Sequence, residues 1–177
     1  LRLYTKGDHD TRPEFDLPEI LRAELAELVL HLRSVGIAPE ELAWLTAPPS
    51  EALLGAEALL RSLSAVDPQG RLTELGARMT RLPLHPRFAR IVLEAQARGL
   101  ARDGCTVAAL LSDGRDVYRR RDHETRAGHG AIDGNCDVSM RLVDIAEDAA
   151  DLDRGVVSAV MRVRDQLLDA REGSTKS

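Results

Sequence analysis

The chain has 177 residues, which fits either one large domain or two small modules. Hydrophobic residues make up 44% of it but aromatic residues only 3%, so a core of Leu, Ala and Val is required, and this favours helices over a β-sandwich. The net charge of -5 does not mark the whole chain as a nucleic-acid binder. The sequence contains no apolar run that could span a bilayer, so no membrane partner is expected.

Charge is distributed unevenly along the chain. Residues 1–70 carry 6 basic and 12 acidic side chains, residues 71–126 carry 12 and 7, and residues 127–177 carry 6 and 10. A basic middle between acidic flanks is the part expected to attract a polyanion. The two cysteines, Cys105 and Cys136, have no metal-binding spacing, which predicts a reduced, cytoplasmic protein.

The first half of the chain reads as a short strand followed by helices. Alternating residues over Leu1–Thr5 predict a strand without a neighbour, which implies that sequence upstream is missing. A helix of about 17 residues is expected from the cap Asp16 to Gly36. Pro39 begins a short helical turn, Pro48-Pro49 forces an extended link, and Ser50 caps a second long helix.

A two-stranded β-hairpin is expected next, over residues 65–72, around the turn Asp67–Gly70. Thr73 then caps a third helix, Pro86 lies in the first turn of a fourth, and Asp103 opens a fifth. Residues 113–136 lack any period and predict a long loop, after which Asp137 and Asp153 cap the last two helices. The predicted fold is mainly α: a winged helix, made of helices and a small hairpin, followed by a helical bundle.

Catalytic motifs are missing from the sequence. It contains no phosphate-binding glycine loop, zinc-protease helix or nucleophile elbow, so no catalytic, cofactor-binding or metal-binding residue is predicted in this chain. One group of possible ligands, His123, His129, Asp133 and Cys136, matches no common zinc spacing and favours a solvated loop.

Two arginine groups are candidate nucleic-acid contacts. The first is the triplet Arg119, Arg120 and Arg121, whose guanidinium groups suit phosphate oxygens. Acidic neighbours in the same loop leave an alternative open, in which the triplet is neutralised locally. The second group flanks the Pro83–Pro86 bend and consists of Arg78, Arg81, Arg87 and Arg90, with ordinary solubilising charge as its alternative.

Six motifs resemble, in order and spacing, the region after the second RecA-like domain of DEAH-box/RHA helicases of the HrpA/HrpB kind. They are Arg2–Thr5, Pro18–Arg22, Val29–Ile37, Pro48-Pro49, Leu72–Gly76 and Leu82–Pro86. The sequence Leu-Pro-Leu-His-Pro at residues 82–86 is similar to the HrpB branch in particular.

This resemblance implies a domain order and a set of partners. Residues 1–16 would end the second RecA-like domain and form a connector, residues 17–72 a degenerate winged helix, and residues 73–177 the helicase-associated bundle, or ratchet. The chain would dock on the RecA-like motor domains of the same polypeptide and line a channel for single-stranded RNA or DNA. ATP and Mg would bind in those missing motor domains, so this chain alone would not be an enzyme.

Two departures from the family accompany the resemblance. Glu24 stands where many relatives have Asn, which disfavours a phosphate contact there, and no oligonucleotide-binding barrel is recognised after residue 170. The alternative function is a stand-alone winged-helix module that binds DNA or a protein through the helix from Ser50 to Ser64. That helix carries Arg61 against Glu51 and Glu57, and a net negative helix reads DNA poorly.

Overall fold

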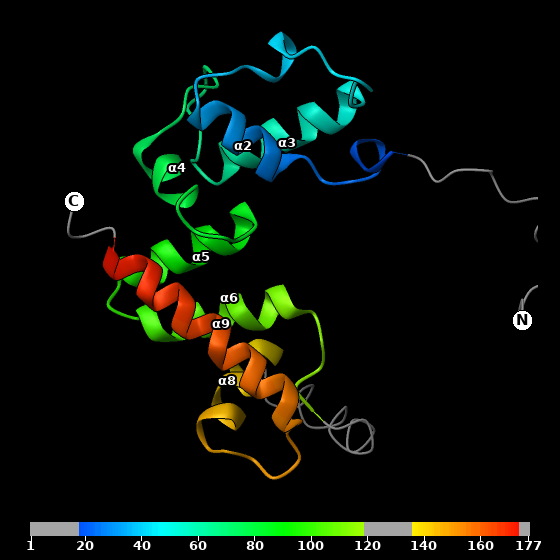
Figure 1. Ribbon diagram of the computed structural model, residues 1–177. Coiled ribbons are helices and arrows are strands. Elements are labelled where there is room, and N and C mark those ends of the chain that lie inside the picture. Colours follow the sequence, from blue (N-terminus) through cyan, green and yellow to red (C-terminus); the bar gives the residue numbers. More distant parts are fainter. Residues whose placement is uncertain (1–17, 119–135, 174–177) are drawn as a thin grey trace, which may run out of the picture.

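A computed structural model describes residues 18–118 and 136–173, so the strand expected over Leu1–Thr5 and its RecA-like context lie outside the described residues. The described part is mainly helical, as predicted (Figure 1). Its elements are η1 (Glu19–Leu21), α2 (Ala26–Ser34), η2 (Pro39–Glu41), α3 (Ser50–Ser62), α4 (Glu74–Met79), α5 (Pro86–Ala97), α6 (Ala101–Asp113), α8 (Asp137–Ala146) and α9 (Arg154–Gly173). Among these described residues, no helix has the length and apolar character needed to cross a bilayer.

The helices surround two hydrophobic cores. Helices α2, α3 and α4 lie together at one end of the molecule, with α5 between them and α6, α8 and α9 (Figure 1). The first core joins α2 and α3 to α4, α5 and α6, and therefore continues across residue 72. One face of α3 is turned to this core: Ala56 and Leu60 are buried, and Leu53 and Leu63 pack against the core.

The prediction of a single long helix from Asp16 to Gly36 is wrong for the described residues. The short helix η1 ends at Leu21, and α2 begins only at Ala26. Tertiary packing accounts for the break, because Ile20 packs against the same core that buries Leu25 and Val29. On one continuous helix, Ile20 would face away from the side that carries those two residues.

The two-stranded hairpin expected over residues 65–72 is not present as strands. A single antiparallel bridge joins Val66 and Leu72, around a turn that Gly70 closes with a φ of 78°. The neighbouring helices leave no length for a ladder. The amides of Ala65 and Val66 donate to the Leu60 carbonyl at the end of α3, and Thr73 already caps α4.

Local features define where α4 and α5 begin. The Thr73 hydroxyl accepts the Gly76 amide at 2.9 Å, as the sequence predicted, and Pro86 occupies the first turn of α5. Close packing fixes the positions of α4 and α6. A Cβ atom at Gly76 would lie 2.1 Å from the Ala65 carbonyl oxygen, and one at Gly104 would lie 2.3 Å from the Ala95 Cβ.

The second core lies at the other end of the molecule and is crossed by α9. Val156 and Val160 of α9 are buried in it, whereas Leu167, further along the same helix, is buried in the first core. The expected cap of this helix is confirmed, since the Asp153 carboxylate accepts the amides of Gly155 and Val156 at 2.9 and 3.1 Å. Helix α9 therefore ties the two cores together.

Candidate nucleic-acid interface

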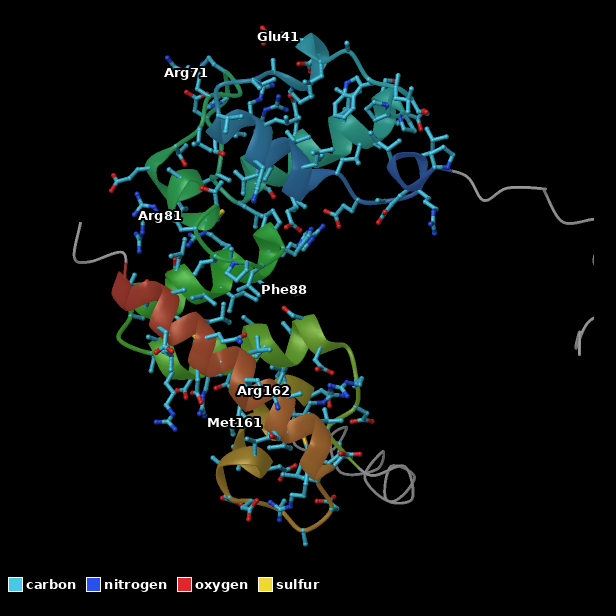
Figure 2. The ribbon with its side chains drawn as sticks, viewed as in Figure 1. Glu41, Arg71, Arg81, Phe88, Met161 and Arg162 are labelled. Atoms are coloured by element: carbon cyan, nitrogen blue, oxygen red, sulfur yellow. The ribbon has the colours of Figure 1, made fainter. Side chains whose placement is uncertain are left out.

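Three exposed arginines gather around the α4–α5 bend. Arg78 lies in the last turn of α4, Arg81 lies in the bend, and Arg87 is in the first turn of α5. Within residues 18–118 and 136–173, none of the three forms an ion pair or a side-chain hydrogen bond. Figure 2 shows Arg81 projecting outward beside α4. Because their charge is not neutralised by a carboxylate, these guanidinium groups are available to phosphate oxygens.

Arg90, predicted together with Arg87, is in a different electrostatic environment. Its guanidinium lies 2.7 Å from Glu94, and the same carboxylate pairs with Arg98 at 2.8 Å. Hydrogen bonds from Arg98 and then Arg90 lower the pKa of Glu94 below its ordinary value. Arg90 therefore shares one negative charge with Arg98, whereas Arg87 shares none among the described residues.

Arg119, Arg120 and Arg121 lie outside the described residues, as do His123, His129 and Asp133. The segment before them is described. Arg115 binds both oxygens of Asp113, at 2.6 and 2.8 Å, and this pairing lowers the pKa of Asp113. Local neutralisation thus applies to Arg115, while the proposed role of the triplet stays a prediction.

The segment 18–72, which carries α2 and α3, has the opposite charge balance. Residues 18–72 carry 8 acidic and 4 basic side chains, and three of the four arginines are engaged. Arg33 and Arg61 both bind Glu57, at 2.8 and 2.7 Å, and Arg71 binds Asp67 at 2.7 Å. Hydrogen bonding by the Arg71 amide is the main cause that lowers the pKa of Asp67. This segment therefore offers little free positive charge to a polyanion.

A shallow groove of about 500 Å³ along η1 and α2 adds to the negative charge of this segment. Its apolar lining includes Ile20 and Leu28, and its polar lining includes Glu19, Glu24 and Glu27. Three carboxylates beside one groove repel a phosphate backbone. The groove and its glutamates were not predicted as a site from the sequence, because they come together through the break between η1 and α2.

Further unpaired arginines lie on the bundle. Arg102, in the first turn of α6, and Arg162, on α9, are exposed and form no ion pair with any residue that the structure describes. Figure 2 places Arg162 on α9, in the half of the molecule away from α2 and α3. The sequence did not single out either residue, since the immediate neighbours of each are neutral or acidic. Among the described residues, no group of three or more His, Cys, Asp or Glu side chains could hold a metal ion.

Known proteins match this chain in sequence. Residues 56–84 match the family described as helicase-associated domain (HA2), winged-helix. The chain is 37% identical over 118 residues to the ATP-dependent RNA helicase HrpA of Escherichia coli K12, covering 63% of this chain and 9% of HrpA. It is 35% identical over 112 residues to the human probable ATP-dependent RNA helicase DHX35, covering 62% of this chain and 16% of DHX35.

Solved structures match it in fold. The crystal structure of the Escherichia coli DEAH/RHA helicase HrpB is similar with a TM-score of 0.67 and 25% identity, over 95% of this chain and 18% of HrpB. A second structure, of the E. coli DExH-box NTPase HrpB, gives a TM-score of 0.63 at 24% identity, over 94% of this chain and 17% of that one. The chain therefore spans less than a fifth of the length of these relatives.

Proposed function

Because this chain is related to the helicase-associated region of DEAH-box RNA helicases, we propose that it is the nucleic-acid-channel and motor-docking module of such an enzyme, without catalytic activity of its own. The observation that carries the proposal is the set of exposed, unpaired arginines Arg78, Arg81 and Arg87 at the α4–α5 bend. Contacts from such groups go to the sugar-phosphate backbone and are independent of base sequence.

The proposed partner is single-stranded RNA, with DNA as the chemically similar alternative. Stacking residues are scarce in this chain, so charge dominates the interaction and the isolated chain binds weakly. RecA-like motor domains of the same polypeptide are the second partner. They would hold ATP and Mg and move the strand past this module, in the cytoplasm. The division into residues 1–16, 17–72 and 73–177 belongs to the same proposal.

The stand-alone DNA-binding alternative has less support. In a DNA-binding winged helix the second helix enters the major groove and its side chains contact base edges. Arg61 is the basic residue of α3, and its guanidinium binds Glu57 one turn earlier on the same helix. A base contact would have to break that ion pair, and Glu51 would still repel the phosphates.

A pair of single substitutions tests the proposed function. Arg87→Gln and Arg90→Gln remove the same charge from the first half of α5, but within the described part of the chain only Arg90 has a carboxylate partner. We expect Arg87→Gln to weaken the binding of single-stranded RNA more than Arg90→Gln, measured by fluorescence anisotropy at several salt concentrations. Equal RNA affinity for wild type and Arg87→Gln would remove the bend from the proposed interface.

A further inference from the structure

His85 makes contacts on two sides of its imidazole ring. It caps α5, because its Nδ1 accepts the Arg87 amide at 3.4 Å. Its ring also packs edge-on against Phe88, with the ring centroids 5.9 Å apart at 64°. Figure 2 shows Phe88 on α5, between the half of the molecule with α2 and α3 and the half with α6 and α9.

The cap determines where the ring carries its proton. A nitrogen that accepts a hydrogen bond is unprotonated, so neutral His85 carries its proton on Nε2. This Nε2 atom is buried and has no well-formed hydrogen bond within the described residues. Its charged neighbour is Glu24, whose Oε1 lies 3.3 Å away. A negative charge beside a ring nitrogen favours the proton on that nitrogen, so the Glu24 carboxylate stabilises the tautomer that the cap requires.

This contact connects two parts of the chain. Glu24 lies in the break between η1 and α2, whereas His85 begins α5. Among the described residues, the His85–Glu24 contact links the segment 18–72 to the helices that follow α4. The salt bridges of residues 18–72 stay within that segment.

We propose that His85 is a positioning residue, a neutral imidazole with its proton on Nε2 that fixes the first turn of α5 against the segment before α2. The proposal rests on the two nitrogens of one ring: Nδ1 accepts the Arg87 amide, and Nε2 lies beside the Glu24 carboxylate. Its consequence for nucleic-acid binding rests on the proposed function, because the turn that His85 holds carries Arg87.

Nitrogen NMR of the imidazole rings in the complete 177-residue chain tests the tautomer directly, at about pH 8, where an ordinary histidine is neutral. We expect His85 to show a protonated Nε2 and an unprotonated Nδ1. Glu24→Gln keeps an acceptor oxygen and should preserve this pattern, whereas Glu24→Ala should shift the ring toward a mixture of tautomers. A ring protonated on Nδ1, or a pattern that Glu24→Ala leaves unchanged, would overturn the proposal.

Hydrogen exchange of the Arg87 amide tests the positioning itself. Loss of an N-cap typically costs about 1 kcal/mol, so His85→Ala should raise the exchange rate of this amide about fivefold. His85→Asn supplies a good capping oxygen and should restore most of the protection. Glu24→Ala should raise the rate as well, by a smaller factor, although it lies on another element. Thr73→Ala, which removes the cap of α4, is the matched control and should leave this amide unaffected.

An Arg87 amide that exchanges at the wild-type rate in Glu24→Ala would show that Glu24 does not act through His85, which contradicts the proposal. Neither measurement involves RNA. If Arg87→Gln leaves RNA affinity unchanged while the tautomer and exchange results hold, the proposed function fails at the bend and the positioning role of His85 stands. If Arg87→Gln weakens RNA binding and Glu24→Ala leaves the exchange of the Arg87 amide unchanged, the proposed function stands and the positioning role of His85 fails.

Discussion

The Arg90 guanidinium lies 2.7 Å from the Glu94 carboxylate, one helical turn along α5, and Glu94 also pairs with Arg98. A single acidic residue thus restrains two arginines in the turns of α5 that follow Arg87. Helix α5 is therefore divided into a first turn with an unpaired arginine and later turns in which positive charge is partly neutralised.

Removing this restraint should increase nucleic-acid affinity. Glu94→Gln keeps the size of the side chain but releases Arg90 and Arg98, so we expect tighter binding of single-stranded RNA and a steeper dependence on salt. A filter-binding titration at several salt concentrations measures both quantities. Glu74→Gln is the control, since Glu74 lies in the first turn of α4 and forms no ion pair with the described residues. An equal gain in both variants would reflect net charge alone.

The arginine triplet provides a second prediction. Changing Arg119, Arg120 and Arg121 together to Ala should lower RNA affinity and flatten its salt dependence, because fewer counterions are released. The midpoint of urea unfolding should barely change. In a full-length helicase the same change should impair unwinding more than basal ATP hydrolysis. Unchanged affinity and salt slope would assign the triplet to local neutralisation, as occurs at Arg115 and Asp113.

A third prediction concerns the close packing of α4 against Ala65. Gly76→Ala should destabilise the chain by about 3 kcal/mol, because the new Cβ would lie 2.1 Å from the Ala65 carbonyl oxygen and force the backbone to shift. Gly55→Ala is the control within helix α3, where nothing lies within 4 Å, and it should stabilise the chain by about 0.5 to 1 kcal/mol. Urea unfolding measures both. A Gly76→Ala variant as stable as wild type would refute the described packing of α4.

Acid sensitivity of the turn before α4 provides a fourth prediction. Asp67 accepts the amides of Gln69 and Arg71, and its pKa in the folded chain is lowered from 3.8. A lowered pKa means that the carboxylate stabilises the fold above about 3.8 and that this contribution is lost as pH falls through the folded value. Asp67→Ala should therefore be less stable than wild type at neutral pH, and the difference should shrink below pH 3.8. A difference independent of pH would contradict the assignment.

Local patterns in the sequence accounted for much of the fold. The caps Thr73 and Asp153 and the proline at the start of α5 depend on residues within a few positions of one another, and all three are present. The predicted caps Ser50 and Asp137 are wrong, because each is already the first residue of its helix and caps it with no side-chain hydrogen bond. The break before α2 was missed because it depends on Ile20 reaching a core built from distant helices. The missing ladder at residues 66–72 has a similar cause, since the ends of α3 and α4 occupy the space.

The candidate site was predictable only in part. The spacing of Arg90 and Glu94 at i and i+4 on a predicted helix was a readable signal that Arg90 would be paired. No local pattern predicted the contact between His85 and Glu24, because these residues are far apart in the sequence and meet only when the segment 18–72 packs on α5. Arg102 and Arg162 could likewise not be predicted as site residues, since single arginines on predicted helices usually belong to a solvated face.

The central claim is that arginines without carboxylate partners form the nucleic-acid interface, and two triple variants of equal charge test it most directly. The first variant changes the arginines that have no partner among the described residues, Arg78, Arg81 and Arg87, to Gln. The second variant changes three paired arginines to Gln: Arg61, Arg71 and Arg115, which bind Glu57, Asp67 and Asp113.

The measurement is the affinity for single-stranded RNA as a function of salt. Each lost phosphate contact lowers the logarithmic slope by about 0.7, so the first variant should lose about two units of slope together with most of its affinity. The second variant should stay close to wild type. Equal losses in both variants would show that binding follows net charge, and would contradict the interface proposed at the α4–α5 bend.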